Sequence, residues 1–404
     1  MKVNYITTHE DWKSALVELQ DIPKLCADFE TTGLDARVHK PRLLQLCTTQ
    51  KDVENRIVYV IDFFKVPDLS GLKELIESRE MLLFHNANFD VQFLLALGID
   101  FKGKIFDTFV AERCITAGLK ERKTNPETNA SYFSEISCSL KNVVSRRFDI
   151  ELSKEQQVSD WSKPDLDIEQ IEYAALDVDI LPQVAAMQLT ELAGENLLEV
   201  YTLESKCIRP VALMCHYGLR MDVEKLLQLK AKKKQELEEL TMEFCVSLDN
   251  RLPEGSKLPR REDGTLAIGK KANKEFNPGS NVQCVKYFEI LNVDLPFNQD
   301  TGKTTMSQVA LGEFDSKDET LNLLRKRTKL KTALAHVEKL LENINPIDGR
   351  MHSGYNTYGA NSGRFTCSGA KKVTGKKPKS QWGVNVQQVP RDGEFREPFI
   401  ASKG

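Results

Sequence analysis

The feature that most constrains the fold is the order of two kinds of periodicity along the first half of the chain. Short apolar, β-rich runs separated by Gly, Asp, His and Lys predict three strands joined by turns, at 24–32, 42–49 and 56–62. A helix is expected at 70–79 and a buried strand at 81–86, and helical spacing follows to about residue 192. This order, in which strands come first, helices follow and one helix lies between the strands, predicts a mixed α/β sheet packed by helices.

The second half of the chain has a different character. Beyond Leu203 the spacing is almost entirely helical, with a Pro-, Gly- and Lys-rich loop region at 253–280 and a return to helices at 281–345. The last sixty residues are rich in Gly, Asn, Ser and Lys and do not predict a closed domain. With a hinge expected at 192–196, the predicted domains are 1–196, 197–345 and 346–404.

Hydropathy and cysteine usage exclude several classes of protein. The 404 residues contain no apolar run of about 18 or more, and the first residues lack the basic-then-apolar order of a signal peptide, which excludes membrane and secreted proteins. The nine cysteines are odd in number and form no C-x-x-C pair. That pattern indicates a reducing, cytoplasmic compartment without a zinc ribbon or a disulfide framework.

The formal charge of −3 conceals an uneven distribution. Residues 321–404 carry a net charge of +10, and residues 1–320 carry −13. Metal-binding carboxylates in the acidic part and polyanion contact in the basic part would explain this split, and so would chance clustering.

Three short motifs carry the candidate chemistry, and the first lies on a strand. Asp28 and Glu30 flank Phe29 at the end of an apolar run, so the two-residue strand period places both carboxylates on one face. Such a pair can hold a divalent metal or simply be the polar end of a strand. In the second motif, Asn86 ends the strand expected at 81–86, and Asp90 falls in the first turn of a helix, where it can complement the positive helix N-terminus without any other role.

The third motif is helical. Tyr173 and Asp177 are four residues apart and so lie on one helix face, a spacing that packing alone can also produce. Chance seldom supplies all three motifs in this order and in these structural contexts.

Residues 22–190, with these motifs, resemble the DEDD superfamily of 3′-5′ exonucleases, in the subtype with tyrosine in its third motif. The resemblance implies an RNase H-like fold. It also implies that two Mg²⁺ or Mn²⁺ ions are bound by four carboxylates, those of Asp28, Glu30, Asp90 and Asp177. In the same resemblance, Tyr173 orients the attacking water. The chemistry agrees, because hard divalent ions prefer oxygen ligands and two of them about 4 Å apart can stabilise both the attacking and the leaving oxygen. Terminal bases that stack on Phe89 and Tyr173 would hold a single-stranded 3′ end, and Asn86 is a further candidate for contacting it.

Other polar residues in this half of the chain are weaker candidates. Asp107 follows the second motif as an Asp-Thr pair and is not expected to bind metal, and His85 is expected to be a satisfied, partly buried histidine. The run at 300–305 contains Gly-Lys-Thr, but Phe297 stands where the first glycine of a phosphate-binding loop belongs, and no strand precedes it.

The second half resembles family A DNA polymerases, from the junction after the exonuclease through the thumb into the first part of the palm. The resemblance is carried by ESKCIRPVALMCHYGLRMD, FNPGSNVQ, RKRTKLKTALAHVEKLL, GRMHSGYNTYGANSGRF and VNVQQVPRDGEFREPF, in that order. It implies contact with primer-template duplex by Arg364, Asn385 and Gln387, whose side chains offer donors for minor-groove and phosphate acceptors. A longer insertion than is usual, with five lysines, separates Arg364 from Asn385, and it is either a phosphate-contacting loop or merely solvated.

The sequence ends before the palm aspartates that the resemblance would require for nucleotide transfer, so we expect no polymerisation by this chain alone. Three functions follow as hypotheses: a proofreading exonuclease portion of a family A DNA polymerase, a stand-alone RNA-trimming exonuclease, or a non-catalytic DNA-binding subunit awaiting a separate chain with palm and fingers.

Overall fold

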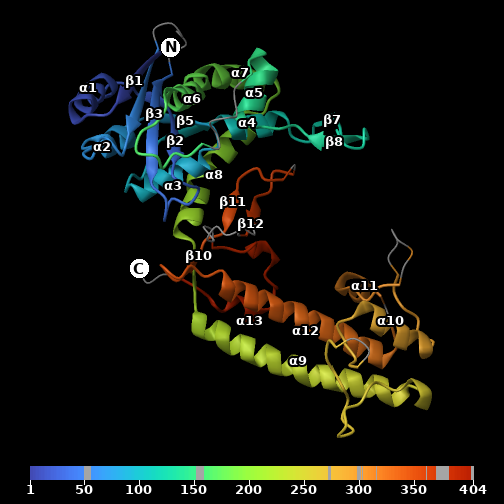
Figure 1. Ribbon diagram of the computed structural model, residues 1–404. Helices are drawn as coiled ribbons and strands as arrows, with labels where there is room; N and C mark the ends of the chain where they lie inside the picture. The colour runs from blue at the N-terminus through green and yellow to red at the C-terminus, as the bar shows by residue number, and fades with distance from the viewer. Residues whose placement is uncertain are drawn as a thin grey trace. The chain divides into compact units, whose positions relative to one another are not determined.

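The computed structural model describes residues 1–49, 56–151, 159–271, 274–297, 302, 304–314, 316–360, 362–369 and 382–401 (Figure 1). Most of the lysine-rich insertion and part of the Gly-Lys-Thr run lie outside the described residues. The chain forms two compact units: 1–219 with 345–387, and 220–344 with 388–404. Within the described ranges, no helix has the length and apolarity needed to cross a membrane.

The first unit is built on a six-stranded mixed sheet, as predicted. Its strands lie side by side in the order β1 (Lys2–Ile6), β4 (Ile57–Asp62), β3 (Pro41–Thr48), β2 (Lys24–Thr31), β5 (Met81–Phe84) and β6 (Lys104–Asp107). β3 pairs antiparallel with both β2 and β4, while β1, β5 and β6 join parallel to their neighbours. The strands predicted at 24–32, 42–49 and 56–62 are thus the antiparallel part of the sheet, and the strand predicted at 81–86 joins it parallel to β2.

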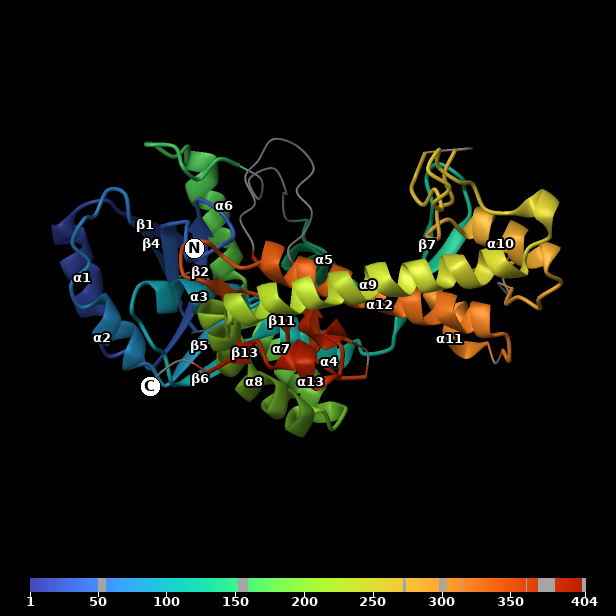
Figure 2. The same cartoon turned by 90° about the horizontal axis from the view of Figure 1, so that it is seen from below.

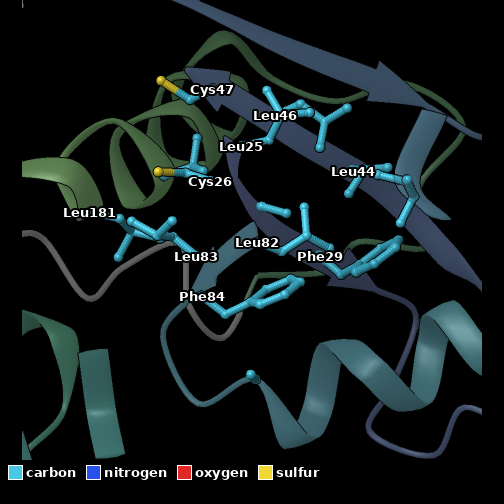
Figure 3. Close-up of a cluster of buried hydrophobic side chains, with 14 of the residues drawn as sticks. Leu25, Cys26, Phe29, Leu44, Leu46, Cys47, Leu82, Leu83, Phe84 and Leu181 are labelled. Atoms are coloured by element: carbon cyan, nitrogen blue, oxygen red, sulfur yellow. The ribbon is translucent and has the colours of Figure 1, made fainter. Parts of the chain in front are cut away.

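The residues of the central strands explain why this sheet is buried. Six consecutive residues of β3 are buried, which is the pattern of a strand covered on both faces. Its apolar side chains meet those of β2 and β5 in one core, which includes Phe29, Leu44 and Phe84 (Figure 3). At about 25 cal/mol per Å² of apolar surface, such burial is the main stabilising contribution to the unit.

Helices cover the sheet and close the first unit. They are α1 (His9–Leu19), α2 (Leu72–Glu77), α3 (Asn88–Ala96), α4 (Thr108–Ile115), α5 (Leu140–Phe148), α6 (Ile168–Asp179), α7 (Leu181–Gly194) and α8 (Leu198–Tyr217). α6 packs against β1 to β4 and begins with a capping box, in which the Asp167 side chain and the Gln170 side chain each bind the other's backbone N–H. This cap fixes where α6 starts, and therefore which of its residues face the sheet.

Several elements of the first unit were not predicted from the sequence. These are β1, α1, the short strand β6, the hairpin of β7 (Lys120–Thr124) and β8 (Ser131–Glu135), and the hairpin of β11 (Gly354–Asn356) and β12 (Thr366–Ser368). β10 (Arg350–Met351) and the 3-10 turn η3 (Val386–Gln388) complete this part of the chain. The sequence of β6 is typical of a helix because the strand is only four residues long and runs directly into α4.

The second unit is dominated by two long helices, as its sequence predicts. α9 (Val223–Arg251) and α12 (Glu319–Glu342) lie side by side (Figures 1 and 2). Lys230 pairs with Glu338 at 3.4 Å, and Arg251, at the other end of α9, pairs with Asp318 at 2.8 Å, so the two helices are antiparallel. The Asp222 and Asp318 side chains cap the two helices at their starts.

The second unit has an aromatic core that contains Phe244, Phe276 and Phe288, and its remaining elements are short. They are α10 (Asn281–Ile290), α11 (Gln308–Glu313), α13 (Gly393–Arg396), the 3-10 turn η2 (Glu254–Ser256), and the paired strands β9 (Leu219–Met221) and β13 (Phe399–Ile400).

Candidate active site

Strand β2 carries the first two carboxylates. Phe29 between them is 4% exposed and lies in the core, whereas Asp28 and Glu30 are only partly buried on the opposite face. The pairing of β2 with β3 shifts register after Glu30, so the acidic pair marks the end of the regular ladder. The strand period thus places the two side chains as the sequence predicted.

Helix α6 brings the third carboxylate to this strand end. Ligand oxygens of Asp28, Glu30 and Asp177 lie within 4.8 Å of one another, in the one such cluster found among the described residues. One turn earlier on the same helix, the Tyr173 hydroxyl donates a hydrogen bond to the Asp177 carboxylate. The tyrosine therefore lies beside the acidic cluster and is held by one of its members.

Asp90 approaches the same strand from the first turn of α3, directly after the turn that follows β5. Its Oδ1 accepts the backbone N–H of Phe29 at 3.1 Å, and its side chain is almost fully buried. It lies outside the 4.8 Å cluster but lines the same cleft. The turn depends on Asn86, whose φ of 70° is left-handed, a conformation that Asn tolerates better than most residues.

The electrostatics of the cluster are unfavourable for bare carboxylates. Burial, followed by the charge of Asp177, raises the pKa of Asp28 well above its ordinary value, and burial and the neighbouring acids do the same to the pKa of Glu30. Burial also raises the pKa of Asp177 to about 6, although the Tyr173 hydroxyl opposes this. Converging oxygen donors that destabilise one another fit divalent cations, which prefer carboxylate ligands and relieve the repulsion.

The cluster opens into a cleft of about 1100 Å³ within the first unit. Asn86 is exposed there, and Phe89 lines the cleft with its ring packed against Phe93 at 4.9 Å between centroids. Both residues therefore line the same cleft as the acidic cluster.

Sequence reasoning missed one wall of the cleft. Residues 356–359 and Thr366, around the hairpin β11–β12, line it although they lie almost two hundred residues after α6. The Asn88 Nδ2 donates to the Tyr355 carbonyl at 2.9 Å, and the Arg113 Nε donates to the Tyr358 carbonyl at 3.3 Å. No local signal could reveal these contacts, because they join segments that are far apart in the sequence.

The residues predicted to touch duplex DNA gather elsewhere in the first unit. Arg364 and Gln387 are exposed, and the Gln387 Nε2 donates to the carbonyl of Phe365, the neighbour of Arg364, at 3.0 Å. The Asn385 Oδ1 accepts the Gln387 backbone N–H at 3.1 Å. The structure thus brings the three residues together, and none of them is among the described residues that line the cleft.

Two residues considered from the sequence have structural roles. His85 shares a hydrogen bond with the Thr108 hydroxyl at 2.8 Å, and burial lowers its pKa to about 4, so it is the satisfied histidine that was expected. The Asp107 carboxylate accepts backbone N–H groups from both sides, including those of Asn86 and Phe109 at 2.9 and 2.8 Å. It joins the turn that carries Asp90 to the start of α4.

Fold and site together define a nuclease domain of the RNase H-like type, in which acidic side chains from a sheet strand and a helix meet beside a tyrosine. A family model for the 3′-5′ exonuclease of the DNA polymerase A type matches residues 3–192. This match confirms the sequence-based identification of a 3′-5′ exonuclease domain in these residues, and exonucleases of this kind use divalent metals.

Relatives extend this similarity beyond the nuclease domain. The chain is 27% identical over its whole length to DNA polymerase I of Aquifex aeolicus (strain VF5) and covers 60% of that protein. Its fold matches a solved structure of the POL domain of Pol1 from M. smegmatis in complex with DNA primer-template and dNTP, with a TM-score of 0.66 and 17% identity, over all of this chain and 59% of that one. By contrast, ribonuclease D of Gluconacetobacter diazotrophicus is 28% identical over only 48% of the chain, which covers 44% of that enzyme.

Proposed function

We propose that this chain is the metal-dependent 3′-5′ exonuclease portion of a family A DNA polymerase, and that it removes nucleotides from DNA 3′ ends during proofreading. The observation that carries the proposal is the meeting of Asp28, Glu30 and Asp177 in a cleft, beside Tyr173. The alignment with DNA polymerase I over the whole chain supports DNA rather than RNA as the substrate. In this proposal residues 1–196 are the exonuclease, 197–345 a thumb-like region and 346–404 the start of a palm.

Asp28, Glu30, Asp90 and Asp177 are the residues that would hold two Mg²⁺ or Mn²⁺ ions. When bound, such ions lower the pKa of the attacking water and stabilise charge on the leaving oxygen. Tyr173 orients that water through its hydroxyl, which Asp177 holds in place. The Phe29 N–H fixes one oxygen of Asp90, so the direction of its carboxylate is set before substrate arrives.

The nucleic acid is bound in two places in this proposal. Asn86 and Phe89 contact the unpaired 3′ end in the cleft, where stacking on an aromatic ring holds a base whatever its identity. Arg364, Asn385 and Gln387 contact primer-template duplex. A separate chain that carries palm and fingers would complete the polymerase, and the nine free cysteines fit a cytoplasmic location.

The deciding experiment incubates the purified chain with 3′-labelled single-stranded DNA or RNA, with Mg²⁺ and then with chelator. We expect mononucleotides from DNA only when metal is present. Faster release from RNA would replace the proposal by the RNA-trimming function, and inert behaviour with both substrates would favour the non-catalytic subunit.

The assignment of the acidic residues is tested by Asp90→Ala and by the isosteric Asp90→Asn. Both variants should keep the circular dichroism spectrum of the unchanged chain and lose nuclease activity. Asp100→Asn is the matched control, because Asp100 is a partly exposed acid of the same unit that pairs with Arg209 outside the cleft. Full activity of the Asp90 variants would overturn the assignment.

A further inference from the structure

The hairpin β7–β8 presents exposed aromatic rings that the proposed chemistry does not use. Phe133 is 70% exposed and Tyr132 is 49% exposed, and both are on β8. Figure 1 shows this two-stranded ribbon projecting from the helices and sheet of the first unit. An aromatic ring exposed on a projecting ribbon is accessible to a binding partner.

The register of the hairpin separates its side chains onto two faces. Arg122 lies directly opposite Phe133, and Lys120 lies opposite Glu135, so these four residues share one face. Arg122 and Ser131, also on this face, are joined by a hydrogen bond of 3.1 Å. Lys123 and Tyr132 are opposite one another on the other face, together with Glu121.

The two faces differ in charge. On the Tyr132 face, Lys123 is neutralised by Glu121 at 2.8 Å. On the Phe133 face, Glu135 is engaged by Arg113 at 3.2 Å, and within the described parts of the chain neither Lys120 nor Arg122 has an acidic group within 4.0 Å. The Phe133 face therefore combines an exposed ring with two cations, Lys120 and Arg122, that pair with no described acidic group. Exposed aromatic rings and cations are the groups that bind single-stranded nucleic acid.

The Phe133 face is also continuous with the cleft. Glu135 and Arg113 both line the cleft that holds the acidic cluster. Phe133 is two residues from Glu135 along the same strand, a distance of roughly 7 Å. A strand whose 3′ end occupied the cleft would have its next nucleotides beside this face.

We propose that the Phe133 face of the β7–β8 hairpin binds the single-stranded DNA upstream of the nucleotide being removed. Phe133 stacks on a base, and Arg122 and Lys120 contact phosphates. The proposal rests on the proposed exonuclease function for its choice of DNA, but the binding that it describes requires no cleavage.

The first test measures binding, by fluorescence anisotropy of a labelled twelve-nucleotide single strand in chelator. Loss of a stacked base predicts that Phe133→Ala weakens binding about fivefold or more. Phe297→Ala, which removes an equally exposed ring from the other unit, should leave affinity unchanged. Arg122→Gln should reduce the salt dependence of binding, whereas Lys123→Gln should reduce it less because Glu121 already neutralises that lysine.

The second test uses cleavage and separates the two proposals. Phe133→Ala should raise KM for the twelve-nucleotide strand and leave kcat unchanged, and it should not affect a dinucleotide, which fits in the cleft alone. Equal affinity of Phe133→Ala and the unchanged chain for the longer strand would overturn the inference even if the exonuclease is active. Conversion of a dimer to a monomer by Phe133→Ala, with DNA affinity intact, would also overturn it and would identify a second copy of the chain as the partner.

Discussion

Replacement of Asp107 tests how the fold positions the turn that carries Asp90. Its buried carboxylate accepts four backbone N–H groups: those of Asn86, Ala87, Phe109 and Val110. The last two lie in the first turn of α4, and losing such a cap costs about 1 kcal/mol. The first two lie in the turn before α3, and each unpaired buried N–H costs about 1–3 kcal/mol.

For Asp107→Ala we therefore expect the free energy of unfolding to fall by about 3–5 kcal/mol. This is less than the summed cost of the four lost hydrogen bonds, because removing a buried acid also removes its desolvation cost. The same cost of burying a charged carboxylate raises the pKa of Asp107 to about 6. Asp107→Asn keeps one acceptor oxygen, so its free energy of unfolding should fall by about half as much as that of Asp107→Ala. Urea unfolding at neutral pH measures both changes.

Asp68→Ala is the matched control for the unfolding series. Asp68 also accepts a backbone N–H two residues ahead, that of Ser70, but it is exposed, so we expect little change in the urea midpoint. A loss for Asp107→Ala below about 1 kcal/mol would refute the view that this carboxylate holds the turn together. Nuclease activity of the folded Asp107→Asn variant should fall too, since the start of α3 would be less well positioned.

Three further changes test other parts of the structure. Tyr173→Phe keeps the ring but loses the hydroxyl, so kcat on single-stranded DNA should fall about 10- to 100-fold with KM unchanged. Burial opposes ionisation of Glu112, but Gln188, Arg146 and Arg147 hold its pKa below the ordinary value. The Glu112 carboxylate therefore stabilises the fold above its unfolded-state pKa of about 4.3, and this stabilisation is lost as the pH falls through its folded-state pKa. Because glutamine does not titrate, Glu112→Gln should make the dependence of the free energy of unfolding on acidic pH shallower. Lys233→Met removes the 2.5 Å pair with Glu394, and limited proteolysis should then cut 388–401 faster.

The sequence predicted the parts of the site that depend on local periodicity. The two-residue period of a strand is enough to place Asp28 and Glu30 on one face. A spacing of four residues in a helix is enough to align Tyr173 with Asp177. Their meeting in space was inferred from a family resemblance, because no periodicity relates a strand at residue 28 to a helix at residue 177.

Elements that contain only one or two repeats of their own periodicity could not be predicted from the sequence. The four residues of β6 contain two strand periods at most, and the apolar residues that follow in α4 made the whole segment look helical. The wall of the cleft around Tyr358 was equally hidden, since its position is set by contacts with Asn88 and Arg113 that only the folded chain makes.

The division of the first unit into two stretches of sequence has a consequence for synthesis on the ribosome. The cleft wall at 356–359 and Thr366 is made only after the 125 residues of 220–344, a delay of roughly 6–25 s at about 5–20 residues per second. Because α9 and α12 are antiparallel, their pairing returns the chain close to where α9 began, which lowers the entropy cost of bringing the late segment back. The nascent first unit therefore acquires this cleft wall only after residues 220–344 have been synthesised, and translation products that end before residue 356 would carry the acidic cluster with one wall missing.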